Sequence, residues 1–322
     1  MLIWILILPC AVTTAATLLL LRLGATPMDR PNSRSLHDQP IPRIGGVALM
    51  IGASVGWLIG HPGAVAPLAW LSIGLGAFCL IDDVRSLPVV LRLAAQLCAA
   101  GAALWLGPIA PASLPLAAVL MLVVVWGANL YNFMDGSNGL AGGMTLFGFG
   151  FLALGAWLAG AQGYLELCAA VSSAALGFLF FNFDPARIFM GDAGSVPVGF
   201  LAATVGLSGY LTGIWNWTFP VLIFLPFIAD SSVTLLKRLL RRERVWRAHR
   251  EHYYQRLVRI GLKHRGAALL AYTLMLAGGC AAIYTRNSSA VTQRGVLVAF
   301  ACCYFVSMAA FDAKWRRTGL PP

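Results

Sequence analysis

Two polar stretches of this chain combine carboxylates, amides and glycines in a pattern that suits Mg²⁺ and phosphate. In NLYNFMDGSNGLAGG, 129–143, an Asn or Asp recurs every three residues, so these side chains would share one side of a helix or tight turn: Asn129, Asn132, Asp135 and Asn138. In FFNFDPARIFMGDAGS, 180–195, Asp192 precedes an apolar run. Oxygen ligands bind Mg²⁺, glycine permits close backbone approach, and a helix start attracts anions. The plainer interpretations are an Asn-rich turn and an N-cap at Ser195.

A pair of adjacent carboxylates, Asp82 and Asp83, follows the third apolar run in LIDDVRSLPVVLRLAAQ, 80–96. Because neighbouring carboxylates repel each other, the pair requires a cation, a proton or water. Arg85 and Arg92 are candidate ion-pair partners or anion ligands. The simpler alternative is a solvated loop.

The most basic stretch, 237–265, contains eleven Lys and Arg, three His and two Glu. Read as a helix, it has an apolar stripe with a polar flank: Trp246, Tyr253, Leu257 and Ile260, and His249, His252 and Arg256. This pattern predicts a basic amphipathic segment at the membrane interface, where most arginines would attract anionic lipid. The two histidines have no third metal ligand nearby, so we expect them to contact phosphate or substrate rather than zinc.

The composition indicates an integral membrane protein. Of 322 residues, 59% are hydrophobic and 11% are charged, whereas soluble domains contain about 25% charged residues. A spanning helix needs about 20 apolar residues, and eleven runs approach that length: 2–22, 44–60, 65–81, 89–107, 114–133, 141–160, 164–181, 195–212, 218–236, 266–285 and 293–311. The sequence therefore predicts one all-α polytopic domain over residues 1–322, with about eleven transmembrane helices.

Charge placement predicts the orientation of these helices. Loops after the odd-numbered runs, together with the C-terminus and the helix ends beside them, contain 21 of the 23 Lys and Arg, and the opposite side contains only Arg286 and Arg294. The positive-inside rule then places the N-terminus outside and the C-terminus in the cytoplasm. It also explains the net charge of +11 without a nucleic-acid partner. Ten of the twelve acidic residues lie on the same side, all but Glu166 and Asp230, which indicates an active site on the cytoplasmic face.

Five motifs, in this order, resemble those of the polyprenyl-phosphate N-acetylhexosamine-1-phosphate transferases: HDQPIPRIGG, DDVRSLPVVLRL, NLYNFMDGSNGLAGG, FNFDPARIFMGDAGS and HREH. Each falls on a predicted cytoplasmic loop. The resemblance implies an enzyme of a bacterial plasma membrane that requires Mg²⁺ or Mn²⁺. It would transfer a sugar 1-phosphate from a UDP-N-acetyl-amino sugar to undecaprenyl phosphate and release UMP. Membrane lipids and a second copy in a homodimer are the further partners that we expect.

The resemblance also implies roles for the acidic residues. Asp192 matches the Mg²⁺ carboxylate, and Asn132 matches a second ligand or a contact to the diphosphate. Asp82 and Asp83 match the paired aspartates, one of which would act as general base for the lipid phosphate or position it. Asp135 resembles the Asp of a turn near the metal or nucleotide.

Further residues are expected to bind substrate. His249 and His252 stand where the family binds nucleotide sugar, and Arg256 lies beside them. Arg43 belongs to the first-loop pattern, Arg85 follows the aspartate pair, and Asn138 lies in the motif that contains Asn132.

Three departures resemble the branch that initiates O-antigen or common-antigen synthesis. Asn138 replaces a second Asp, Ser86 replaces an Asp or Lys, and two residues rather than one separate the histidines of HREH. The resemblance to this branch implies UDP-GlcNAc, or a 6-deoxy relative such as UDP-FucNAc or UDP-QuiNAc, as the donor.

A transporter or flippase of lipid-linked sugars is the alternative of another class. Transporters place polar residues near the membrane midplane, and here only Asp230 lies well within an apolar run, about 10 Å from its cytoplasmic end. It could complete the same site or make a helix–helix contact. A CDP-alcohol phosphotransferase is disfavoured because its DGxxAR…GxxxDxxxD spacing is absent.

Overall fold

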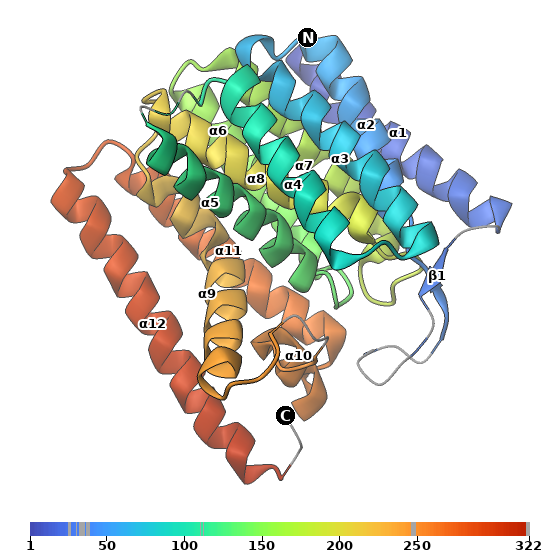
Figure 1. Ribbon diagram of the computed structural model, residues 1–322, viewed down its shortest axis with the longest axis vertical. Helices are drawn as coiled ribbons and strands as arrows, with labels where there is room; N and C mark the ends of the chain where they lie inside the picture. Colours follow the sequence, from blue (N-terminus) through green and yellow to red (C-terminus); the bar gives the residue numbers. More distant parts are fainter. Residues whose placement is uncertain are drawn as a thin grey trace.

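The computed structural model describes residues 1–24, 27–29, 31, 36, 39–109, 111, 113–245 and 249–319. Eleven long helices form a bundle in this part of the chain (Figure 1): α1 (Leu2–Leu23), α2 (Gly45–Gly60), α3 (Ala66–Arg85), α4 (Val89–Leu106), α5 (Leu114–Phe133), α6 (Leu140–Leu158), α7 (Gln162–Asn182), α8 (Asp192–Leu211), α9 (Thr218–Leu240), α11 (Lys263–Thr285) and α12 (Ala290–Arg317). Ten are long and apolar enough to cross a membrane, and α2 is a shorter apolar helix. The predicted all-α polytopic fold is confirmed.

The remaining elements are short. Strands β1 (Met28–Asp29) and β2 (Ile41–Pro42) pair antiparallel. A 3₁₀ turn, η1 (Gly63–Val65), precedes α3, while α10 (Tyr253–Leu257) and the π-helical turn η2 (Val258–Leu262) lead into α11. The two termini lie at opposite ends of the bundle in Figure 1, as an odd number of crossings requires.

Helices α7 and α8 form the centre of the bundle. Helix α7 packs against α1, α2 and α6, whereas α8 packs against α2, α3 and α5. Both are apolar around most of their circumference, which is typical of enclosed helices. Helix α12, by contrast, runs along one side and contacts the others mainly at α9 (Figure 1).

Glycines allow α2 and α8 to meet closely at the start of each helix. A Cβ added at Gly46 would lie 2.3 Å from the Cα of Gly194. In addition, the N–H of Gly45 donates to Phe189 O at 2.9 Å, and that of Gly46 donates to Met190 O at 2.8 Å. The loop before α8 thus satisfies N–H groups that α2 cannot pair internally, and it is fixed against the first loop.

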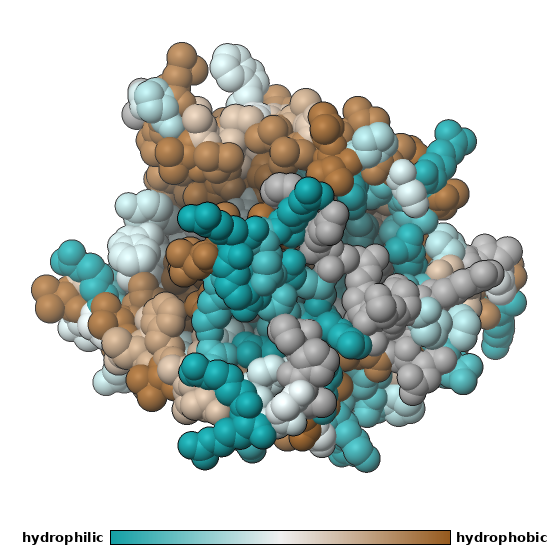
Figure 2. Space-filling view, turned by 60° about the horizontal axis from the view of Figure 1, so that its bottom comes forward, coloured by the Kyte–Doolittle hydropathy of each residue, from teal (hydrophilic) through white to brown (hydrophobic). Residues whose placement is uncertain are grey.

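Hydrophilic side chains gather at one end of the bundle. Figure 2 shows this end turned toward the viewer, with a hydrophilic patch at its centre and hydrophobic side chains around much of its edge. The connections α3–α4, α5–α6, α7–α8 and α9–α11 all lie at this end, since successive helices alternate in direction. The sequence motifs are therefore on one face of the molecule.

Two local expectations need correction. Asp82 and Asp83 belong to the last turn of α3, which extends to Arg85, rather than to a loop. Residues 237–265 do not form one amphipathic helix: α9 continues to Leu240, residues 243 and 244 are not helical, and α10 and η2 follow. Gly261, with φ of 103°, interrupts the helical backbone there. Trp246, expected on the apolar stripe, lies outside the described residues.

Replacing Gly46 by alanine should destabilise the protein, because the new methyl group would overlap the α8 backbone. Overpacking of this kind costs about 1–3 kcal/mol. We expect a lower midpoint of thermal unfolding in detergent. Gly295→Ala is the matched control, since an added Cβ at that helical position meets no atom within 4 Å. Equal midpoints for the two variants would contradict the proposed close contact.

Candidate active site

A polar cavity of about 510 Å³ lies at the end of the bundle where the motifs meet. Its walls come from the first loop, the ends of α3 and α5, the starts of α4 and α8, and the segment around α10. The charged, amide and imidazole side chains that line it are Asp29, Arg43, Asp82, Arg92, Gln96, Asn129, Asn132, Asp135, Asp192, His249, His252 and Gln255. Segments far apart in the sequence thus build one site.

The start of α8 is the centre of the site. Gly191, its N-cap, donates its N–H to Asp135 Oδ2 at 3.2 Å, and Ala193 donates its N–H to Asp83 Oδ2 at 3.2 Å. The first N–H groups of a helix lack partners within it and carry partial positive charge. Two carboxylates from other elements use these donors, and Asp192, the first residue of α8, adds a third.

Asn132, in the last turn of α5, orients the Asp192 side chain. Its Nδ2 donates to Asp192 Oδ1 at 2.8 Å and to Ser195 Oγ at 2.9 Å. The Ser195 hydroxyl donates in turn to Gly191 O at 3.1 Å, so Ser195 is not the N-cap that was expected. Because the amide nitrogen is engaged, only Oδ1 of Asn132 remains to face a cation.

The paired aspartates have different partners. Asp83 Oδ1 lies 3.4 Å from Arg43 Nη2, which also donates to the Asp83 carbonyl at 3.0 Å. Asp82 accepts the N–H of Leu87 at 2.6 Å and lies 3.6 Å from Arg92 Nη1. Of the two, Asp82 lines the cavity, while Asp83 is buried behind its wall.

Negative charge is concentrated around Asp135. The pKa of Asp135 is raised well above its usual range, mainly by burial away from water and then by the Asp192 carboxylate. Such a group favours a bound proton or a neighbouring cation. Among the described residues, no three His, Cys, Asp or Glu side chains are placed to hold a metal by themselves. Mg²⁺, however, keeps several waters and needs only one or two carboxylates plus substrate phosphates, so Asp135 and Asp192 fit this ion.

Asp230 of α9 organises the histidine segment. Its carboxylate accepts the N–H groups of Tyr253 and Tyr254, both at 2.9 Å, and lies 3.2 Å from His252 Nδ1. The start of α10 is thereby fixed to α9. The His249 ring packs edge-on against that of His252, with centroids 4.8 Å apart. Asp230 therefore makes a contact between helices, which was one of the roles expected for it, and it acts on the site through His252.

The sequence is similar to those of known enzymes. The sequence profile of glycosyl transferase family 4 matches residues 65–210, which include the aspartate pair, Asn132, Asp135 and Asp192. The chain is 29% identical to a probable undecaprenyl-phosphate N-acetylglucosaminyl 1-phosphate transferase of Bacillus subtilis, over 84% of the chain and 79% of that protein. The chain is therefore similar to polyprenyl-phosphate N-acetylhexosamine-1-phosphate transferases.

Two further relatives align with most of this chain. It is 26% identical to an undecaprenyl-phosphate alpha-N-acetylglucosaminyl 1-phosphate transferase of Escherichia coli, over 90% of the chain and 84% of the relative. It is 27% identical to a decaprenyl-phosphate N-acetylglucosaminephosphotransferase of Mycolicibacterium smegmatis, over 88% and 81%. The likeness therefore extends beyond the part that the family profile matches.

Most of the predicted site residues come together in or directly behind the cavity: Arg43, Asp82, Asp83, Asn132, Asp135, Asp192, His249 and His252. Asn138 lies next to this group, and its Nδ2 donates to Asp184 Oδ1 at 2.8 Å. It thereby joins the α5–α6 turn to the α7–α8 connection instead of lining the cavity.

Two predicted substrate ligands lie elsewhere. Arg85 is exposed at the end of α3 and does not line the cavity. The Arg256 guanidinium donates to Asp312 Oδ1 at 2.8 Å and lies 4.2 Å from the centroid of the Tyr253 ring. Arg256 therefore joins α10 to α12, and this structural contact accounts for the residue without a role in substrate binding.

The sequence did not predict two residues that shape the site. Gln96 Oε1 accepts a hydrogen bond from Asn129 Nδ2 at 2.6 Å, and its spacing of four from Arg92 signals that both share one face of α4. His264 joins two loops, since its Nδ1 lies 2.9 Å from Ser137 Oγ and its Nε2 lies 3.0 Å from Leu36 O. No local pattern distinguishes His264 from the basic residues around it.

Acid should destabilise the folded protein partly through His249. Burial, followed by the charges of His252 and Arg238, lowers the pKa of His249 from 6.5 to about 3. Above pH 6.5 the ring is neutral in both folded and unfolded chains, so it does not affect stability. Between these two values the unfolded chain gains a proton that the folded chain does not, so stability falls as the pH falls. His249→Gln should reduce this loss by at most about 1 kcal/mol near pH 5, because solvent screens the partly exposed ring.

The measurement is the midpoint of thermal unfolding in detergent as a function of pH. His61→Gln provides the control, since His61 is exposed at the opposite end of the bundle. Identical acid sensitivity of the wild type and His249→Gln would show that this ring does not carry the effect.

Proposed function

We propose that the protein transfers a sugar 1-phosphate from a UDP-N-acetyl-amino sugar to undecaprenyl phosphate and releases UMP. The observation that carries the proposal is a group of three carboxylates around the start of α8. Asp135 and Asp192 line a cavity that also contains arginine and histidine, and Asp83 lies directly behind its wall. Phosphoryl transfer depends mainly on positioning and on neutralising charge. The names of the relatives support the same reaction type.

Asp192 and Asp135 would hold Mg²⁺, and Asn132 keeps the Asp192 carboxylate in place. The bound ion would neutralise the diphosphate charge that develops as UMP leaves. Because burial and the Asp192 carboxylate raise the pKa of Asp135, a proton and the cation would compete for this side chain.

Arg43 and the histidines would bind the nucleotide side of the substrate. Arg43 and His249 both line the cavity, and the Arg43 side chain is about one-third exposed there. A guanidinium matches the geometry of phosphate oxygens well. His252 is fixed by Asp230 and by stacking on Phe133, with ring centroids 6.2 Å apart, so it supports this wall of the cavity.

Direct attack by the lipid phosphate on the sugar phosphate is the simplest mechanism. A phosphomonoester has a second pKa near 6 and is mostly ionised at neutral pH, so the reaction needs no strong base. Asp82, which lines the cavity beside Arg92, would position the lipid phosphate. Asp83 is already bound to Arg43 and to the α8 backbone, and it would orient Arg43.

We further propose GlcNAc as the amino sugar, because the relatives are named for it. The reaction would start a surface polysaccharide of the O-antigen type. It would take place at the cytoplasmic face of a bacterial plasma membrane, as the positive-inside bias of the loops indicates.

The first test is UMP release by the purified protein in detergent with Mg²⁺, undecaprenyl phosphate and a panel of UDP-amino sugars. We expect turnover that EDTA abolishes and that Asp192→Asn lowers by about 10²–10³-fold. Glu166→Gln should retain activity, because Glu166 is a buried carboxylate at the opposite end of the bundle, bonded to Gln162. UDP-sugar uptake into sealed vesicles without UMP release would instead support a transporter. Full activity of Asp192→Asn would contradict the metal role.

A pair of arginine variants tests the placement of the nucleotide. Arg43→Gln should raise the KM for the UDP-sugar by about tenfold, the equivalent of one lost charged hydrogen bond. Arg85→Gln should leave it unchanged, because Arg85 does not line the cavity. Thermal unfolding of both variants establishes that they are folded. An equal effect of the two substitutions on KM would overturn the assignment of Arg43.

A further inference from the structure

Helix α12 lies along one side of the bundle, and most of its surface is exposed (Figure 1). Near its end, four residues at spacings of three and four share one face: Met308, Phe311, Asp312 and Trp315. Met308 and Phe311 pack with Tyr253 of α10 in a small apolar cluster. This face therefore joins α12 to the segment that carries the histidines.

Asp312 accepts hydrogen bonds from two other elements. The Tyr253 hydroxyl donates to its Oδ2 at 2.9 Å, and Arg256 Nη1 donates to its Oδ1 at 2.8 Å. The ammonium group of Lys237, in the last turn of α9, donates to Oδ2 as well. The Asp312 side chain is only 19% exposed, so these charges are screened less than they would be in water. One carboxylate thus joins α9, α10 and α12.

Aromatic rings enclose the guanidinium that pairs with Asp312. The Cζ atom of Arg256 lies 4.2 Å from the ring centroid of Tyr253. It also lies 5.3 Å from that of Phe311 and 5.6 Å from that of Trp315, both on α12. A cation near an aromatic face is attracted by the ring. Together with the ion pair, these contacts fix α10 against α12.

Helix α10 in turn carries the histidine wall of the cavity. His252 is its N-cap residue, and the His249 ring packs against that of His252 with centroids 4.8 Å apart. Both histidines line the cavity, whereas Asp312 does not. A shift of α10 relative to α12 would move both imidazole rings. Asp312 can therefore act on the cavity only through α10.

We propose that Asp312 is a positioning residue for the nucleotide sugar: it holds α10 in place and thereby presents His249 to the ligand. The inference rests on the proposed function, because that function assigns the histidines to the nucleotide side of the cavity. Asp312 lies outside the five sequence motifs and outside residues 65–210, which the family profile matches. The contacts in the folded chain are what connect it to the site.

Asp312→Asn keeps the size of the side chain but leaves Lys237 and Arg256 without their counter-charge. We expect the KM for the UDP-sugar to rise about tenfold, within the range for residues of one hydrogen-bond network. The kcat and the KM for undecaprenyl phosphate should not change, because the aspartates of the cavity lie on other elements. Lys314→Gln is the matched control, since Lys314 is exposed on the same turn of α12. An equal KM for the UDP-sugar in the two variants would overturn the proposal.

A double-mutant cycle tests whether Asp312 acts through the histidine wall. In a His249→Gln background, Asp312→Asn should raise the KM for the UDP-sugar less than twofold further, because the group that it positions is already lost. A full tenfold increase in that background would contradict the proposed route.

Tyr253→Phe provides a milder variant if Asp312→Asn does not fold, since it removes only the hydroxyl that donates to Asp312 and Lys237 loses one acceptor. The same KM should rise about threefold, the equivalent of one lost hydrogen bond. An unchanged KM in folded Tyr253→Phe would overturn the proposal.

Hydrogen exchange tests the structural step without turnover. Backbone amides of residues 249–257 should exchange several-fold faster in Asp312→Asn than in the wild type, because local opening becomes easier, and Lys314→Gln should match the wild type. Unchanged exchange in Asp312→Asn would overturn the proposal. Faster exchange in a protein that releases no UMP would contradict the proposed reaction but leave the link between α12 and α10 standing.

Discussion

The site depends on the balance between three carboxylates and the first N–H groups of α8. Asp83 and Asp135 reach these donors from other elements, and Asp192 belongs to the helix itself. Without the donors, like charges at such short range would repel one another. The arrangement also requires α8 to start at a fixed place, which the close approach of Gly46 and Gly194 provides. Packing in the bundle and chemistry in the cavity are therefore coupled at one helix start.

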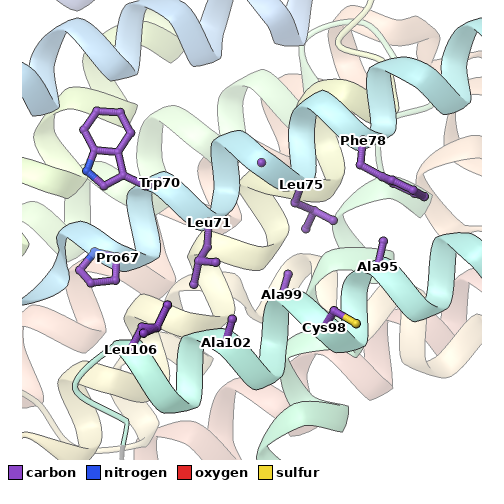
Figure 3. A pocket seen from close by; sticks show the side chains of 11 residues that line it. Pro67, Trp70, Leu71, Leu75, Phe78, Ala95, Cys98, Ala99, Ala102 and Leu106 are labelled. Atoms are coloured by element: carbon purple, nitrogen blue, oxygen red, sulfur yellow. The ribbon is translucent and has the colours of Figure 1, made fainter.

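Polar and apolar side chains occupy different parts of the bundle surface. The motif loops and the cavity occupy one end, whereas the described surface along the bundle is rich in large hydrophobic side chains. The two reactants that we propose, a nucleotide sugar and a lipid phosphate, would approach such a site from water and from the bilayer respectively. Phe78 borders both the cavity and an apolar groove between α3 and α4 (Figure 3), and it marks the place where the two environments meet.

The segment between α9 and α11 shows how an irregular chain is kept in place beside lipid. Asp230 binds the first N–H groups of α10, and Arg256 pairs with Asp312 on α12. In an apolar surrounding, each unpaired backbone group would cost several kcal/mol. Buried charges near the membrane thus serve here to hold a non-helical corner, and through it His249 and His252.

The sequence by itself determined the eleven helices, the end at which the polar motifs gather, and most residues of the site, because apolar run length and charge placement are local properties. It could not decide which motif residues face one another. Asp83 and Asp82 are neighbours in the chain but have separate partners, and Arg85 and Arg256 looked like ligands although they lie away from the cavity. Gln96 shared a helix face with Arg92, but its partner Asn129 is 33 residues away, and His264 carried no local signal because its partner Ser137 is 127 residues away. Tertiary structure decided these points because helix packing alone fixes which faces and loops meet.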